Sequence, residues 1–119
     1  MRCRTGLSMQ ITDRVDGDVM IVSLVGRLVA DKDGFFRAEM ASRANRTGKI
    51  VLDCENLEFL DSTGLGLVVR FYSDFTSSGK KFVLAHVVNK PKLVLEISRA
   101  NKIFRIFKTV EEAVADLNK

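Results

Sequence analysis

The chain has 119 residues, of which 46% are hydrophobic and 29% are charged. This length and balance predict one globular domain with its own core, and they exclude a disordered or fibrous chain. The net charge of +4 comes entirely from the second half of the chain, and no apolar run approaches the roughly 20 residues that a membrane span needs.

The first eight residues show no clear strand or helix pattern. We therefore expect residues 1–8 to be a flexible leader and residues 9–119 to form the domain, with Met9 as a candidate natural start. Cys3 falls in this leader and Cys54 in a predicted core strand. Two cysteines so placed predict free thiols, which are typical of a reducing cytoplasm.

The chain then predicts a β-hairpin and a helix. Residues 9–14 and 19–25 are apolar runs of strand length, and the turn residues Asp16-Gly17-Asp18 separate them. We expect Gly26 to end the second strand. A helix starts within residues 31–34, and its inner face is predicted to carry Phe36, Met40 and Ala44.

Beyond residue 48, short apolar strands alternate with helices. The helix that opens at Asn89, with Pro91 in its first turn, is expected to face inward with Leu93, Ile97 and Ala100. The last helix is expected to bury Val110, Ala113, Val114 and Leu117. The other predicted elements are strands at residues 49–54, 82–85 and 103–107 and a helix at residues 61–77.

The resulting order, β-β-α-β-α-β-α-β-α, predicts an α/β fold. Strand–helix–strand crossovers join parallel strands, so we expect a single domain with a mixed β-sheet of four to five strands packed with about four helices. Residues 50–53 are apolar on both faces and should be central, whereas residues 9–14 alternate and should lie toward an edge.

The sequence shows few of the residue patterns that are typical of enzymes. Ser62 has no G-x-S-x-G elbow around it, and the one histidine, His86, follows a different strand. Asp53 and Asp61 could form a carboxylate pair, although a strand end and a helix cap are simpler roles for them. Phosphate-binding and dinucleotide motifs are missing, and one histidine without a C-x-x-C pair argues against a zinc site. We therefore expect no catalytic residue, metal or cofactor.

The junction at residues 57–66 is the most informative segment. Ser62 and Thr63 follow Asp61 at a predicted helix N-terminus, beside the carboxyl end of a strand, where open α/β sheets bind ligands and partners. Either Asp61 or Ser62 would cap the helix. Two glycines in the first turns each cost a helix about 1 kcal/mol relative to alanine, so we expect something to approach the backbone closely here. This surface for recognition or modification comprises Asp61, Ser62, Thr63, Gly64, Leu65 and Gly66.

Residues 59–66, Phe-Leu-Asp-Ser-Thr-Gly-Leu-Gly, resemble the Asp-Ser-(Ser/Thr)-Gly-Leu-Gly signature of the STAS domain, and within that family the bacterial anti-sigma-factor antagonists. The resemblance extends over most of the chain, from the strand end at residues 24–28 to the segment at residues 87–107. It implies a phosphorylated hydroxyl, with Ser62 as the usual position and Thr63 as the second candidate. Val29, where the family often has an acidic residue, and the unusual loop at residues 30–34 are departures beside the family's partner surface.

The resemblance implies a cytoplasmic regulator of transcription. Its unphosphorylated form would bind an anti-sigma serine kinase and free a sigma factor, phosphorylation at Ser62 would reverse this, and a phosphatase would restore binding. The kinase would use ATP, and this chain would bind no cofactor. Two alternatives remain: a non-phosphorylated STAS binding subunit of a membrane lipid-transport complex, and a small serine hydrolase that uses Ser62.

Positive charge gathers late in the chain. Residues 80–108 carry eight Lys or Arg side chains and a single acidic one, Glu96. A solvated face on two helices explains most of this charge. We also expect it to attract an acidic partner at long range, without specific binding of nucleic acid and without membrane insertion.

Overall fold

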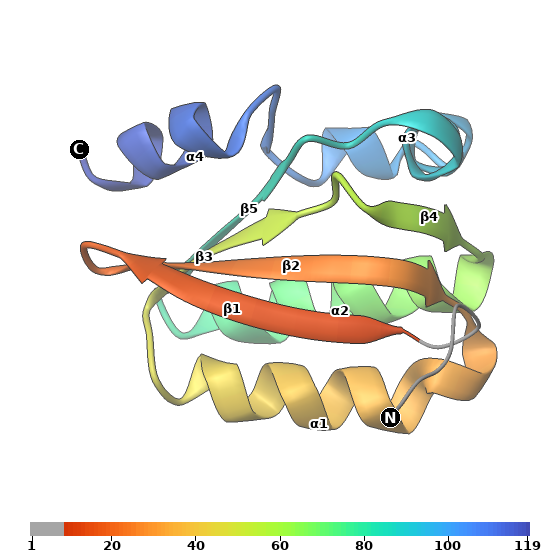
Figure 1. Ribbon diagram of the computed structural model, residues 1–119, viewed down its shortest axis with the longest axis horizontal. Coiled ribbons are helices and arrows are strands. Elements are labelled where there is room, and N and C mark those ends of the chain that lie inside the picture. Colours follow the sequence, from red (N-terminus) through yellow and green to blue (C-terminus); the bar gives the residue numbers. More distant parts are fainter. Residues whose placement is uncertain (1–8) are drawn as a thin grey trace.

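The computed structural model describes residues 9–119, so the expected leader at residues 1–8 and its Cys3 lie outside the described residues. The described chain forms one mixed sheet with helices on both faces (Figure 1). The strands are β1 (Gln10–Asp16), β2 (Val19–Leu28), β3 (Lys49–Asp53), β4 (Leu57–Leu60), β5 (Lys81–Ala85) and β6 (Ile106–Phe107). The helices are α1 (Asp33–Ala44), α2 (Ser62–Ser77), α3 (Asn89–Ile97) and α4 (Val110–Leu117), with 3-10 turns η1 (Ala30–Lys32) and η2 (Ala100–Lys102).

The sheet has the order β1-β2-β3-β5-β6, and β4 pairs with the far end of β2. The β1–β2 hairpin is antiparallel, and the pairs β2–β3, β2–β4, β3–β5 and β5–β6 are parallel. The predicted α/β class and mixed sheet are confirmed. So are the central position of β3 and the edge position of β1.

Strand β2 is longer than predicted because it changes partner along its length. Residues 20–23 pair with β3, and residues 26–28 pair with β4, with a register shift between Gly26 and Arg27. Gly26, which was expected to end the strand, lies inside it with a φ of 104°. Glycine adopts this positive φ without a steric penalty. The strand can therefore bend at Gly26 and reach β4, which occupies residues for which the sequence predicts neither strand nor helix.

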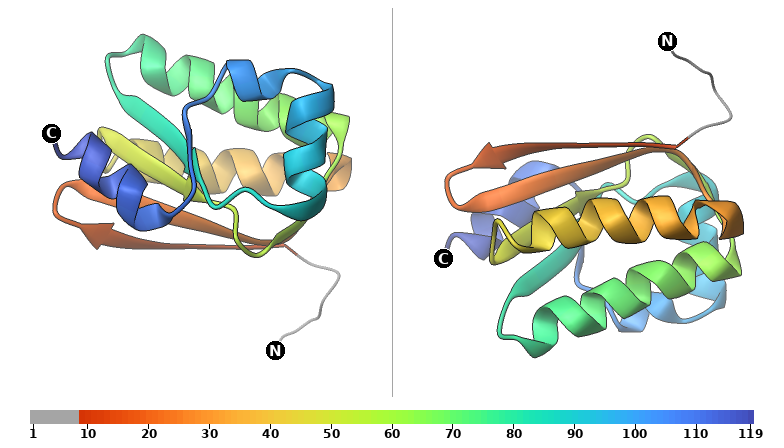
Figure 2. Two further views of the ribbon diagram at one scale, coloured as in Figure 1. Left: turned by 90° about the horizontal axis from the view of Figure 1, so that it is seen from above. Right: turned by 90° about the horizontal axis from the view of Figure 1, so that it is seen from below.

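The two faces of the sheet are covered differently (Figures 1 and 2). Helices α1 and α2 lie side by side on one face, and the larger core cluster there includes Phe36, Met40 and Phe75. Helix α4 covers the other face with the predicted residues Val110, Ala113, Val114 and Leu117, all of them buried. Because α2 begins directly after β4, its start lies at the same end of the sheet as the carboxyl ends of the parallel strands.

The predicted inner face of α3 is wrong. Leu93 is 54% exposed and Ile97 is 75% exposed, whereas Pro91 and Leu95, one turn apart, are buried. Two apolar stripes run along this nine-residue helix, and periodicity alone does not say which of them faces the core. Ala100 is buried as expected, but in η2 rather than in the helix. The last strand is also shorter than predicted, because η2 and the buried Phe104 occupy the preceding residues.

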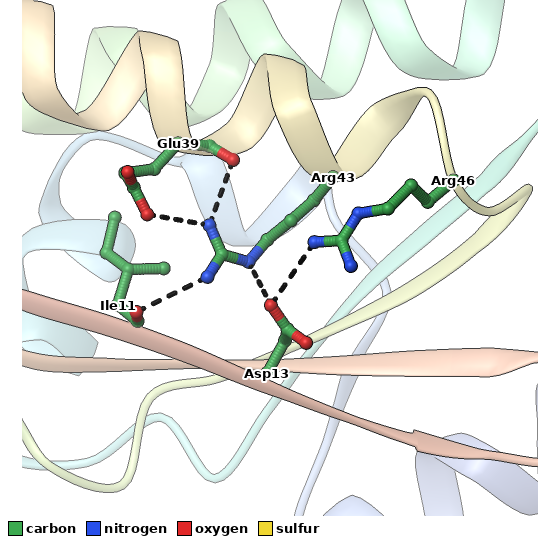
Figure 3. A network of polar contacts seen from close by, with 5 residues as sticks. All are labelled: Ile11, Asp13, Glu39, Arg43 and Arg46. Carbon is green, nitrogen blue, oxygen red and sulfur yellow. Dashed lines mark hydrogen bonds and ion pairs between the residues drawn. The ribbon is translucent and has the colours of Figure 1, made fainter.

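A buried arginine joins the edge strand to α1 (Figure 3). The Arg43 side chain is 10% exposed, and its Nε donates to Asp13 at 2.6 Å. Its other nitrogens donate to the carboxylate and carbonyl of Glu39, at 2.9 and 3.0 Å, and to the carbonyl of Ile11 at 3.4 Å. Because β1 has only β2 as a neighbour in the sheet, these bonds give the hairpin a second attachment to the domain.

Removing this guanidinium should destabilise the domain. We expect Arg43→Ala to lower the free energy of unfolding by about 2 kcal/mol, because the carbonyl of Ile11 loses this donor and the Asp13 carboxylate keeps only Arg46, at 3.4 Å. The matched control is Arg37→Ala on the same helix, whose pair with Asp33 is exposed and 3.5 Å long. An exposed pair contributes roughly 0.5 kcal/mol or less, so this variant should unfold near the wild-type denaturant midpoint. Equal effects of the two substitutions in urea titrations would contradict this account.

Candidate functional site

The predicted recognition surface lies at the N-terminus of α2, after the end of β4. Asp61 is the N-cap, and its Oδ1 accepts a hydrogen bond from the backbone N–H of Gly64 at 2.7 Å. Its Oδ2 accepts from the N–H of Ala30 at 3.3 Å, which ties the loop after β2 to the helix start. Of the two capping candidates, Asp61 is therefore the cap.

Ser62 and Thr63 occupy the first two positions of α2, and both are exposed. Within residues 9–119, neither hydroxyl makes a hydrogen bond that would hold it in the fold. Since Asp61 already satisfies the helix end, the fold does not need the Ser62 hydroxyl. The side chain is thus available for chemistry or contact, at a helix end whose dipole favours negative charge.

The two glycines of the signature have different roles. A Cβ at Gly64 would overlap the carbonyl oxygen of Leu28, so Gly64 lets the start of α2 pack against the end of β2. A Cβ at Gly66 would meet nothing within 4 Å, and this position is exposed. The expectation of a close approach is confirmed at Gly64, where the neighbour is the protein's own backbone. No described neighbour accounts for the glycine at position 66.

The carboxylate pair considered from the sequence does not form a unit. Asp61 bonds to Gly64 and Ala30, whereas Asp53 accepts from Ser23 Oγ at 3.3 Å and from the N–H of Glu55 at 3.1 Å. Asp53 instead joins Glu55 and His86, and polar atoms of these three side chains lie within 4.8 Å of one another.

This cluster is a group of the kind that could hold a divalent cation, and sequence reasoning missed it because the register of β3 against β5 brings the residues together. The distance from His86 Nδ1 to Glu55 Oε1 is 3.9 Å, and each side chain is partly exposed. Water can hydrate all three, and Asp53 already has two donors. The structure therefore supplies these groups with polar partners without a metal.

The buried thiol of Cys54 lies just after the end of β3. Burial, and to a lesser degree the charge of Asp53, raise the pKa of the Cys54 thiol to about 12, so the thiol stays protonated and is a poor nucleophile. Among residues 9–119, no helix combines the length and the apolar character that crossing a membrane requires.

Comparison with known proteins agrees with the signature. The family model described as "STAS domain" matches residues 10–113. A Thermotoga maritima protein named "Putative anti-sigma factor antagonist" is 31% identical over 71 residues, which are 60% of this chain and 63% of that protein, so the match spans less than two thirds of its length. The "Anti-sigma F factor antagonist" of Paenibacillus polymyxa is 28% identical over 113 residues, covering 93% of this chain and 97% of that one.

A solved structure shows the same architecture. The crystal structure of the Thermotoga maritima protein TM1081, titled a "putative anti-sigma factor antagonist", superposes with a TM-score of 0.84 at 25% identity. The superposition covers 92% of this chain and 95% of that one. The two chains therefore share one fold over most of their length.

Proposed function

This chain belongs to the STAS domain family, and from that premise we propose that it is a cytoplasmic anti-sigma-factor antagonist controlled by phosphorylation of Ser62. In this proposal the unphosphorylated chain binds an anti-sigma serine kinase and so frees a sigma factor. Phosphorylation of Ser62 by the kinase, with ATP, releases the chain, and a phosphatase restores it. The names of the two relatives support the antagonist class.

One observation carries the proposal: Asp61 caps α2, and Ser62 is exposed beside it without a structural role of its own. A phosphate there would add about −1.5 to −2 charge. The helix N-terminus stabilises negative charge, so the modified chain should keep its fold. A partner packed on this surface would have to desolvate the phosphate next to the Asp61 carboxylate, which opposes binding.

The hydrolase alternative needs a base within reach of Ser62. Within residues 9–119, His86 lies beside Glu55 and Asp53, and neither His86 nor a carboxylate forms a hydrogen bond with Ser62. The subunit of a lipid-transport complex would use the same surface without phosphate, so detection of phosphate on the chain separates that alternative from our proposal.

The test is phosphorylation of the purified chain. We expect one of the anti-sigma serine kinases encoded in the source genome to transfer one phosphate from ATP to this chain, and peptide mass spectrometry should place it on Ser62. Ser62→Ala should fold and remain bound to the kinase in the presence of ATP, because it cannot accept phosphate. Thr63→Ala is the matched control and should be phosphorylated like the wild type. Phosphate on neither hydroxyl after treatment with every such kinase would refute the proposal.

A further inference from the structure

The Ser62 surface is one wall of an open groove. On the α2 side, the groove is lined by Ser62, Leu65, Gly66 and Val69, and farther along the helix by Arg70, Ser73 and Asp74. The opposite wall comes from the segment after α3 and includes Ser98, Ala100 and Ile103. A partner that fills this groove would contact both α2 and residues 89–108, which we call the α3–η2 segment.

Gly66 lies in the wall of this groove. It is an exposed helical position where alanine would favour the helix, and a Cβ there would contact nothing within 4 Å. The glycine is thus unexplained by the packing of this chain. It is explained if an atom of a bound partner occupies the space that a Cβ would take.

Exposed apolar side chains continue from the groove along α3. Of the large hydrophobic residues that are exposed within residues 9–119, most lie in one segment: Leu93, Ile97, Ile103 and Ile106. Leu93 and Ile97 are one turn apart on the outer face of α3, and Ile97 directly precedes the groove residue Ser98. Exposed apolar side chains grouped in this way are typical of a protein-binding surface.

The same segment carries cations that the fold does not neutralise. Arg105 pairs with Asp116 at 2.7 Å, and its hydrogen bond lowers the pKa of that carboxyl. The other five basic side chains make no ion pair within residues 9–119: Lys90, Lys92, Arg99, Lys102 and Lys108. Glu96 is the single acidic residue among them. Their charge is complementary to an acidic surface.

The shape and charge favour an acidic protein over other occupants. Two copies of this chain would bring like charges together, which opposes association through this face. A bilayer is flat, whereas Gly66 lies in a groove between α2 and the segment after α3.

We propose that the α3–η2 segment is the second half of the partner-binding surface, and that the kinase of the proposed function inserts an apolar side chain over Gly66 while its carboxylates face Arg99 and Lys102. This inference rests on the proposed function. It adds the chemistry of the partner: an apolar protrusion flanked by acidic residues.

Charge reversal tests whether Arg99 and Lys102 face carboxylates of the kinase. Arg99→Glu/Lys102→Glu should weaken binding of the phosphorylating kinase about tenfold or more at roughly 0.15 M salt, and it should flatten the salt dependence of the affinity. The matched control is Arg14→Glu/Lys81→Glu, which makes the same charge change at the opposite end of the sheet and should bind within about twofold of wild type. Equal weakening of kinase binding by both double variants would show that only the net charge of the chain matters, and it would overturn the proposal.

Replacement of Gly66 tests whether the kinase occupies the groove. Gly66→Ala should raise the thermal midpoint by about 4 °C, since alanine favours the helix, yet weaken kinase binding about tenfold. Wild-type affinity in this variant would show that the groove is empty in the complex. Ile97→Ser, which removes apolar surface without changing charge, should also weaken binding.

The remaining outcomes separate the possible failures. If the kinase phosphorylates Ser62 but binds the Gly66, Ile97 and Arg99/Lys102 variants normally, this inference fails and the proposed function stands. If no kinase phosphorylates the chain, both fail. If the wild-type chain cosediments with vesicles containing about 30% phosphatidylglycerol, and Arg99→Glu/Lys102→Glu does not, the segment is a membrane site and the proposal is wrong.

Discussion

Gly64→Ala should lower the free energy of unfolding by about 3 kcal/mol or more, the largest loss expected for any single methyl group added to α2. The added Cβ would collide with the backbone carbonyl of Leu28, which cannot rotate away as a side chain could. Relief requires the helix start to move off β2, and that movement stretches the bonds from Asp61 to Gly64 and Ala30.

Gly66→Ala is the internal control for this prediction, because it makes the same chemical change two residues later where nothing lies within 4 Å. Its free energy of unfolding should rise by up to about 1 kcal/mol. Urea titrations of the two variants give the comparison directly. Similar stabilities for Gly64→Ala and Gly66→Ala would mean that the Leu28 contact is not what demands glycine at position 64.

Ser62→Asp and Ser62→Glu should weaken binding of the kinase at least about tenfold, a penalty of roughly 1.4 kcal/mol. Each adds a carboxylate next to Asp61, and the partner must desolvate this negative pair on contact. Both variants should unfold at or above the wild-type midpoint, because the dipole of α2 favours negative charge at its first residue.

Ser62→Ala separates a charge effect from loss of the hydroxyl, since it should bind the kinase as the unphosphorylated chain does. If the Ser62 side chain had no role in binding, all three variants would bind the kinase like the wild type. Calorimetric affinities, read beside thermal midpoints for the three variants, distinguish these patterns.

Most elements could be predicted from the sequence because each depends on local pattern. The hairpin followed from its turn residues, and the buried face of α4 followed from helical spacing. Strand β4 could not be predicted: its four residues are too few to show a period, and its pairing depends on the bend at Gly26. The inner face of α3 was wrong because Leu93 and Ile97 form an apolar stripe as regular as the buried one.

The site was predictable only where it depends on local sequence. The signature alone places Asp61 and Ser62 at the start of a helix, and Asp61 was one of the two predicted caps. The separate roles of Gly64 and Gly66 depend on what lies across from each, which one sequence does not specify. The sequence assigns the exposed α3 residues Leu93 and Ile97 to the core, so their proposed role in binding rests on the solvent exposure that the structure shows.

The central claim is that phosphate on Ser62 switches partner binding without unfolding the chain. The most direct measurement is calorimetric titration of the kinase, with a non-hydrolysable ATP analogue bound, into the unmodified chain and into the chain phosphorylated stoichiometrically at Ser62. We predict at least about tenfold weaker binding for the phosphorylated form, at unchanged or higher thermal midpoint. Equal affinities for the two forms, or weaker binding accompanied by unfolding of the phosphorylated chain, would contradict it.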